Sequence, residues 1–239
     1  MQPIADAHPP QGSAHHPLGG SPFVSHARHL PAALLLGEVV RHAVSRVPSD
    51  PMPTPVPSIA LPSDLAPELL APERWTPFEV VALGSRAPRP RGVHTRAGVG
   101  DRLRTAAFAE IQARDAFLWA AERFDDAPEP LRTAWRRLSR AEDKHLGWLL
   151  ARMEALGEAP AARLVSDQLW RSLLACTSAA EFAHHMAGAE DWGREAGERL
   201  GARLAAVDPE SAALFARIAE EEVGHIELAR RFFPGSTAT

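Results

Sequence analysis

The sequence has no tyrosine and only one cysteine, Cys176, among its 239 residues. Without tyrosine the chain cannot carry a tyrosyl radical. A single cysteine excludes an internal disulfide framework, and it also excludes a metal centre built from four cysteines. We therefore expect Cys176 to be a small buried apolar side chain in a reducing compartment.

Long apolar runs and an excess of positive charge are also missing. A membrane-spanning helix needs about 20 apolar residues, whereas the best candidate, residues 31–40, is short and contains Glu38. The formal net charge is −4, which argues against a generally basic surface for nucleic acid. We expect a soluble cytoplasmic protein that makes no membrane contact.

Proline divides the chain into two parts. Seventeen of the 22 prolines lie at or before Pro90, and proline disfavours regular structure. The sequence predicts a Pro/His-rich, disordered extension over residues 1–75, with one amphipathic helix over 32–47, followed by an extended lead-in over 76–100. Residues 101–235 are expected to form one all-α domain, a four-helix bundle.

Apolar residues at helical spacing predict the four helices of this domain. Asp101 and Asp208 are good N-caps, and Pro209 suits a first helical position. Gly157 is expected just after the second helix. The connection of about 20 residues between the second and third helices is longer than antiparallel neighbours need, which favours a crossover along the bundle. The expected helices cover about residues 101–124, 131–156, 178–207 and 208–233.

Two Glu-x-x-His pairs interrupt the apolar stripes of the second and fourth helices. Glu142 and His145 form the first pair, Glu222 and His225 form the second, and the pairs are 80 residues apart. Residues three apart share one face of a helix, so each pair points in one direction. The apolar positions repeat with the same offset, and we interpret the domain as one helix pair used twice.

A lone glutamate precedes each pair by 32 residues, at Glu110 in the first copy and Glu190 in the second. Both fall in the apolar seam of their helix. Glu181, Glu195 and Glu198 compete with Glu190, and only the seam register together with the 32-residue spacing selects Glu190.

Four ionised glutamates in one apolar core would be strongly unfavourable without a counter-charge. Two divalent cations would balance them, and two neutral imidazoles would complete the ligand shells. Carboxylate and imidazole donors suit iron or manganese, and the set is typical of dinuclear helix bundles. The prediction is two Fe, with Mn as the alternative. Each ion would take one histidine, with Glu142 and Glu222 as bridges and Glu110 and Glu190 as outer ligands.

The third helix carries two further features, the glycines Gly193, Gly197 and Gly201 and the histidines His184 and His185. The glycines either allow close approach of a neighbouring helix or leave room for a substrate, and close approach is favoured. The two histidines are expected to be satisfied locally, outside the site.

Residues 101–233 resemble the ferritin-like diiron-carboxylate superfamily. Within it the chain is most similar to an uncharacterised branch, a domain of unknown function related to the hydroxylase that modifies isopentenyl-adenosine in tRNA. The resemblance implies a four-helix bundle whose diiron site reacts with O₂ and whose electrons come from an external reductant. The segments that carry it are Glu110-Ile-Gln-Ala113, Glu142-Asp-Lys-His145, Asp167-Gln-Leu-Trp170 and Glu222-Val-Gly-His-Ile226.

Three functions stay open at this point. The first is an O₂-dependent oxidase or hydroxylase of an unknown small-molecule or RNA substrate. The second is a ferroxidase or iron-handling protein. The third is a non-enzymatic bundle that metal stabilises and that binds a partner through its N-terminal segment. The sequence also leaves a homodimer open.

Overall fold

A computed structural model describes residues 59–234, and the regular elements in this range are helices, apart from one isolated backbone bridge between Val80 and Val165. The all-α class is confirmed for these residues, while the helix expected over 32–47 lies outside them. Two 3-10 helices, η2 and η3, precede α1, and a third, η4, follows α2. The elements are η2 (Pro67–Leu70), η3 (Pro72–Trp75), α1 (Arg96–Arg123), α2 (Glu129–Ala155), η4 (Pro160–Ala162), α3 (Gln168–Leu174), α4 (Ala179–Leu204) and α5 (Pro209–Phe232).

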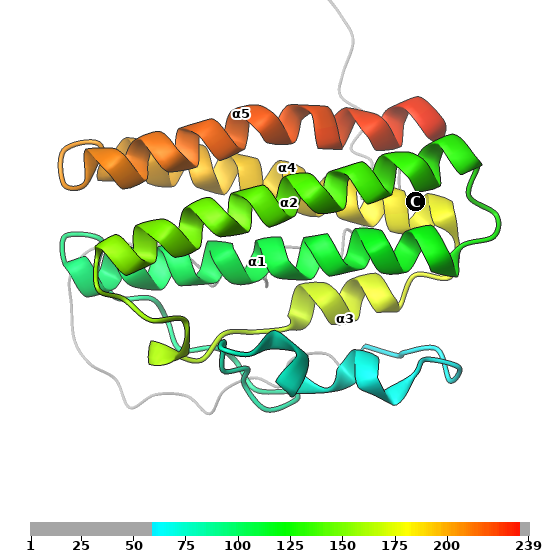
Figure 1. Cartoon of the computed structure of the whole chain (residues 1–239), viewed down its shortest axis with the longest axis horizontal. Coiled ribbons are helices and arrows are strands. Elements are labelled where there is room, and N and C mark those ends of the chain that lie inside the picture. Colours follow the sequence, from blue (N-terminus) through cyan, green and yellow to red (C-terminus); the bar gives the residue numbers. More distant parts are fainter. Residues whose placement is uncertain (1–58, 235–239) are drawn as a thin grey trace, which may run out of the picture.

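The four long helices lie side by side as two hairpins (Figure 1). α1 packs on α2 and α4 packs on α5, and each hairpin has a short connection. The chain between α2 and α4 passes along the length of the other helices and contains α3, so the expected crossover is present (Figure 1). As a result α2 and α4 run in the same direction, and α1 and α4 run in opposite directions.

The start of α1 differs from the prediction. The helix begins at Arg96, and its N-cap is Thr95, whose Oγ1 accepts a hydrogen bond from Gly98 N at 3.0 Å. Asp101, the predicted N-cap, lies inside the helix and is 2% exposed. Aspartate is favoured at helix starts, but the ion pairs of Asp101 with Arg91 and Arg104 hold this residue inside the helix.

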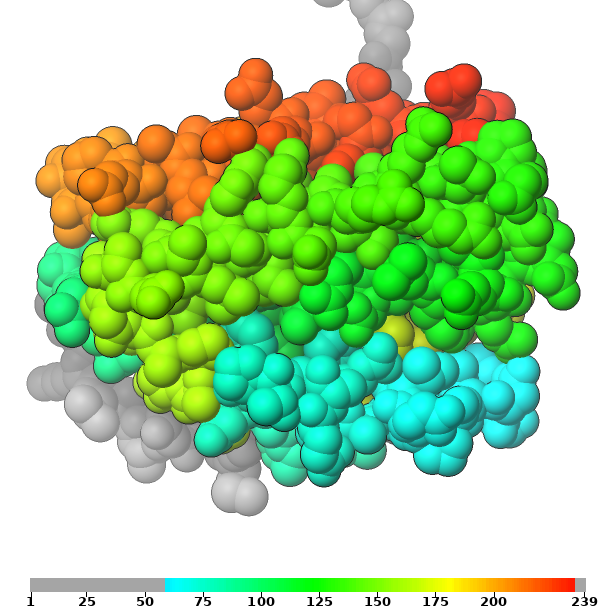
Figure 2. Space-filling model, in the orientation of Figure 1, coloured from blue at the N-terminus to red at the C-terminus, as the bar shows by residue number. Residues whose placement is uncertain are grey.

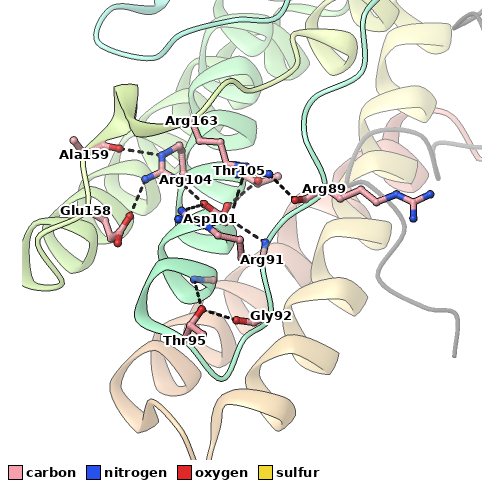
Figure 3. A network of polar contacts seen from close by, with 11 residues as sticks. Arg89, Arg91, Gly92, Thr95, Asp101, Arg104, Thr105, Glu158, Ala159 and Arg163 are labelled. Atoms are coloured by element: carbon pink, nitrogen blue, oxygen red, sulfur yellow. Dashed lines mark hydrogen bonds and ion pairs between the residues drawn. The ribbon is translucent and has the colours of Figure 1, made fainter. Parts of the chain in front are cut away.

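Asp101 is the centre of a polar network that joins three segments (Figure 3). Its carboxylate accepts two hydrogen bonds from the Arg91 side chain, at 2.7 and 2.8 Å, and one from Arg91 N at 2.9 Å. It also accepts one from Arg104, a guanidinium that is 1% exposed. Arg104 in turn donates to Glu158 and to Ala159 O. The network therefore fixes the lead-in and the start of the crossover to α1.

The last turn of α2 ends as the sequence indicates. Gly157 has φ +64°, the left-handed conformation that glycine adopts without penalty. Its N–H donates to Glu154 O at 2.8 Å, and Glu158 N donates to Met153 O at 2.9 Å. These two bonds are the Schellman motif, which satisfies the last carbonyls of the helix.

The boundary between α4 and α5 is partly as expected. Asp208 caps α5, since its Oδ1 accepts a hydrogen bond from Ser211 N at 3.1 Å, and Pro209 is the first helical residue. α4 ends at Leu204, before the predicted end at Val207. Val207 therefore lies outside the helix, and its side chain is 51% exposed in the turn.

Residues 59–75 hold η2 and η3, where the sequence predicts part of a disordered extension. The segment lies along one edge of the molecule, drawn in cyan in Figure 2. Trp75 is buried and packs edge to face on Phe108 of α1 and on Trp170 of α3. Trp170 Nε1 also donates to Leu69 O at 2.6 Å. The segment therefore packs against both α1 and the crossover helix α3.

The apolar stripes of the helices form one core. On α2, Leu131, Trp135, Leu149 and Met153 are at most 1% exposed, as their register predicts. Cys176 is also buried, and burial raises the pKa of its thiol to about 12. Among residues 59–234 no helix is both long and apolar enough to cross a bilayer.

Replacing Asp101 by asparagine should lower the free energy of unfolding by about 3 kcal/mol, because buried Arg104 loses a charged partner. Urea unfolding followed by circular dichroism measures the change. Asp143→Asn is the matched control, since Asp143 is exposed and its ion pair with Arg114 should contribute less than about 1 kcal/mol. Equal effects of the two substitutions would contradict the role assigned to the network.

Candidate metal centre

The six residues selected by the repeat lie together in the middle of the four long helices. α1 supplies Glu110, α2 supplies Glu142 and His145, α4 supplies Glu190, and α5 supplies Glu222 and His225. Their ligand atoms form two groups in which all members lie within 4.8 Å of one another. One group is Glu110, Glu142, His145 and Glu222, and the other is Glu142, Glu190, Glu222 and His225.

Helix register explains why the six side chains converge. Each occupies a position that an apolar residue would otherwise fill, so the packing of the stripe points it inward. On α2, Glu142 and His145 are 0% exposed, between the buried Trp135 and Leu149. The antiparallel hairpins then bring the α2 pair opposite the α5 pair. Glu142 and Glu222 belong to both groups, and they therefore lie at the centre of the cluster.

The two imidazoles present Nδ1 to the carboxylates. His225 Nδ1 lies 2.9 Å from Glu142 Oε1 and 2.9 Å from Glu222 Oε2. His145 Nδ1 lies 3.2 Å from Glu222 Oε1, 3.5 Å from Glu142 Oε2 and 3.6 Å from Glu110 Oε2. Each imidazole therefore contacts both central carboxylates with the same ring nitrogen.

Several atoms in this cluster have no hydrogen-bond partner in spite of the short distances. They are Nδ1 of His145 and His225, both carboxylate oxygens of Glu142, Oε1 of Glu190 and Oε2 of Glu222, and all are buried. A buried polar atom without a partner costs about 1–3 kcal/mol. Converging unpaired oxygen and nitrogen atoms are what a cation would bind. The cluster could therefore hold a metal ion, and its donor types suit Fe or Mn.

The two lone glutamates favour the protonated form. Burial raises the pKa of Glu110 well above its usual value, and the neighbouring charges of Glu142 and Glu222 raise it further. Burial likewise raises the pKa of Glu190, together with the charges of Glu222 and Glu142. Both effects disfavour a further negative charge in an apolar core.

The histidine pairs favour the charged form. Burial by itself lowers the pKa of His145, but the surrounding carboxylates outweigh burial and raise it to about 12. Carboxylates raise the pKa of His225 to about 10 in the same way, against its burial. Burial alone would raise the pKa values of Glu142 and Glu222, whereas the two imidazoles hold both below their usual range. The negative charge of the cluster is thus balanced by protons, and a divalent cation would compete with these protons.

Glu221 is a further residue of the site that the sequence analysis missed. Its Oε2 lies 3.0 Å from Nε2 of His145, on the side of the ring away from the cluster, and it also pairs with Lys144. A hydrogen bond from Nε2–H to this carboxylate leaves Nδ1 free to bind a metal. The sequence gives little indication of this role, because Glu221 is one of three consecutive glutamates and its contact with His145 joins α5 to α2.

The glutamates that competed with Glu190 make other contacts. Glu195 pairs with Arg199 at 3.0 Å, and Glu198 pairs with Arg194 at 2.6 Å. Glu181 accepts hydrogen bonds at the start of α4. Of the four candidates, only Glu190 reaches the cluster.

The two other histidines of α4 also lie outside the cluster. Nε2 of His184 is 3.2 Å from Phe233 O. Nε2 of His185 is 2.9 Å from the hydroxyl of Ser172. Both are satisfied locally, as expected.

A cavity of about 600 Å³ adjoins the cluster, and Glu110, Glu190 and Glu222 form part of its wall. The α4 glycines have different surroundings. A Cβ at Gly201 would lie 3.3 Å from Ala212 O, so Gly201 allows close approach of α5 as predicted. A Cβ at Gly193 would meet no atom within 4 Å, and Gly193 lines the cavity. Gly193 therefore leaves open space, which was the less favoured interpretation.

Binding of Mn²⁺ to the metal-free protein at neutral pH should release protons, because the metal displaces them from carboxyl and imidazole groups. For the same reason the affinity should fall as the pH is lowered. Titration calorimetry in two buffers with different ionisation enthalpies measures the released protons. A binding heat that is the same in both buffers would contradict this assignment of protons.

Comparisons with known proteins give a family and no characterised relative. No curated protein matches the chain, and no solved structure matches it either. A family described as "Protein of unknown function (DUF455)" matches residues 38–238, which include the whole helical domain and all six residues of the cluster. The match covers most of the sequence, and the chain belongs to this family.

Proposed function

We propose that this protein is a ferritin-like diiron oxidase or hydroxylase that acts on an organic substrate. Two iron ions, or manganese ions in their place, would be held by Glu110, Glu142, His145, Glu190, Glu222 and His225. Such a pair of ions, when bound, supplies the activation of O₂, with electrons from an external reductant. The shape and polarity of the protein around the pair would then select the substrate.

The observation that carries the proposal is the arrangement of two ligand groups around a shared pair of carboxylates. Glu142 and Glu222 belong to both groups, and each group adds one glutamate and one histidine of its own. A single ion would leave part of this set unpaired in the core. The ligand pattern is the one typical of dinuclear carboxylate bundles.

The cavity favours an organic substrate over iron storage. Its volume of about 600 Å³ is within the usual range for small-molecule sites. Much of the wall is apolar, and it includes Ala109, Trp192, Leu200 and Phe215. A route for iron ions would need polar groups along its length, and a bundle that keeps metal only for stability would need no cavity at all.

Residues around the cluster have separate roles in this proposal. Glu221 orients the His145 ring through Nε2, so that Nδ1 faces the ions. The apolar residues above and below the cluster keep water away from it, which strengthens every charge interaction inside. Gly193 leaves the space in which the reacting part of a substrate can approach.

Metal analysis tests the proposal directly. Protein expressed with iron and manganese available should contain about two metal ions per chain by mass spectrometry. The Glu142→Ala/Glu222→Ala double variant should lose both ions, because each carboxylate belongs to both groups. Glu227→Ala is the matched control, since Glu227 is an exposed residue of the same helix. A metal content near zero in the unchanged protein would rule out the dinuclear centre.

Oxygen uptake separates the proposed activity from iron handling. The iron-loaded protein with a reductant should consume O₂ beyond one stoichiometric turnover. Uptake that continues only while Fe²⁺ is supplied, together with a growing mineral core, would identify a ferroxidase instead. Metal retention without any uptake would support the bundle in which metal serves stability alone.

A further inference from the structure

The cavity beside the cluster has a strongly basic part, although the chain as a whole has a net charge of −4. Its wall contains several arginines and no lysine. The carboxylates of the cluster form another part of the same wall. The arginines that line it are Arg102, Arg104, Arg163, Arg194, Arg199 and Arg203.

Most of these arginines already have partners. Arg104 pairs with Asp101 and Glu158. Arg163 donates to a backbone carbonyl of the lead-in at 2.7 Å. Arg194 and Arg199 pair with acidic residues of their own helix, α4. These four side chains therefore have structural partners.

Arg102 and Arg203 differ from the others, since within residues 59–234 no acidic side chain forms an ion pair with either. Nε and Nη1 of Arg102 are buried and have no hydrogen-bond partner. Burial lowers the pKa of Arg102, and the nearby positive charge of Arg203 lowers it further. The buried nitrogens of Arg102 therefore lack a partner that a bound anion would supply. Arg203 is exposed and lies close enough to Arg102 to contact the same anion.

The helices place these two arginines at one end of the cavity. Arg102 precedes Glu110 on α1 by two helical turns, a distance of roughly 12 Å along the axis. Arg203 follows Glu190 on α4. Because α1 and α4 run in opposite directions (Figure 1), a residue before Glu110 on α1 and a residue after Glu190 on α4 lie on the same side of the cluster. The wall between the two ends includes Ala106, Ala109 and Leu200.

We infer that the cavity binds an amphipathic organic anion. Its carboxylate or phosphate head lies between Arg102 and Arg203, where the guanidinium groups donate charge-assisted hydrogen bonds. Its apolar body, on the order of 12 Å long, extends past Ala106 and Ala109 toward the carboxylate and imidazole cluster. The proposal that an anion binds here depends only on the cavity and its arginines. The further statement that this anion is the substrate rests on the proposed function.

The first test compares three ligands that have the same apolar body. Decanoate, decyl phosphate and 1-decanol are titrated into the full chain by calorimetry, below the concentrations at which they form micelles. At least one of the two anions should bind, and the neutral alcohol should bind about tenfold more weakly or not at all. The tighter of the two anions identifies the head group as carboxylate or phosphate. Equal binding of the alcohol and both anions would overturn the role of the arginines, and no binding of either anion would overturn the site.

The second test removes the positive charges. Arg102→Gln and Arg203→Gln should each weaken binding of the anion by about tenfold or more and leave the affinity for 1-decanol unchanged. Arg140→Gln is the matched control, since Arg140 is an exposed arginine of α2 that does not line the cavity. An equal loss in the control would mean that only the overall charge matters, which would contradict a specific head-group site.

The third test fills the apolar part of the cavity. In Gly193→Leu the new side chain enters open space, so binding should be lost although both arginines remain. The variant should still fold, because leucine is a better helix former than glycine. Gly188→Leu is the control on the same helix, since Gly188 is exposed and outside the cavity. Retained binding in Gly193→Leu would place the ligand elsewhere.

Metal content keeps the two proposals apart. Binding of the anion to a protein that holds no metal would support the site and refute the diiron function. Two iron ions per chain without any anion binding would support the diiron centre and refute the anion site.

Discussion

The burial of four carboxylates and two imidazoles in one apolar core is the constraint on which the structure depends. A carboxylate that is buried away from water is stable only when it is protonated, paired with a cation or hydrogen-bonded to a donor. Glu142 and Glu222 contact the two imidazoles, which lower their pKa values. Burial raises the pKa values of Glu110 and Glu190 and so favours their protonated forms. The carboxylate charge is therefore offset by groups from four helices, and each of these helices must keep its register.

The other elements of the fold hold the four long helices in this register. The crossover allows the second hairpin to pack so that α2 and α5, the helices that carry the two histidines, face each other across the core. The Asp101 network and the packing of Trp75 on Trp170 hold the lead-in and the crossover against α1. The inward face of each long helix therefore carries both apolar residues that pack the core and the polar residues of the cluster.

Much of the fold and the cluster could be predicted because both depend on local periodicity. The 3.6-residue period placed the four long helices, and the 80-residue offset with the seam register selected Glu190 over three other glutamates of its helix. What failed depends on contacts between side chains that helical periodicity does not encode. Asp101 has the local preference of an N-cap, but its ion pairs with Arg91 and with Arg104 hold it inside the helix. Glu221, the arginine pair and the open space at Gly193 arise only when separate helices come together, and a single sequence carries no signal of that.

The contact between Glu221 and His145 makes the two halves of the repeat unequal. The residue 80 positions before Glu221 is Ala141, which has no polar side-chain atom to offer the other imidazole. A carboxylate on the outer nitrogen makes a histidine ligand more basic, so an ion beside His145 would experience more electron donation than one beside His225. The duplicated set of ligands would therefore offer two chemically unequal sites, one with the more basic histidine His145 and one with His225.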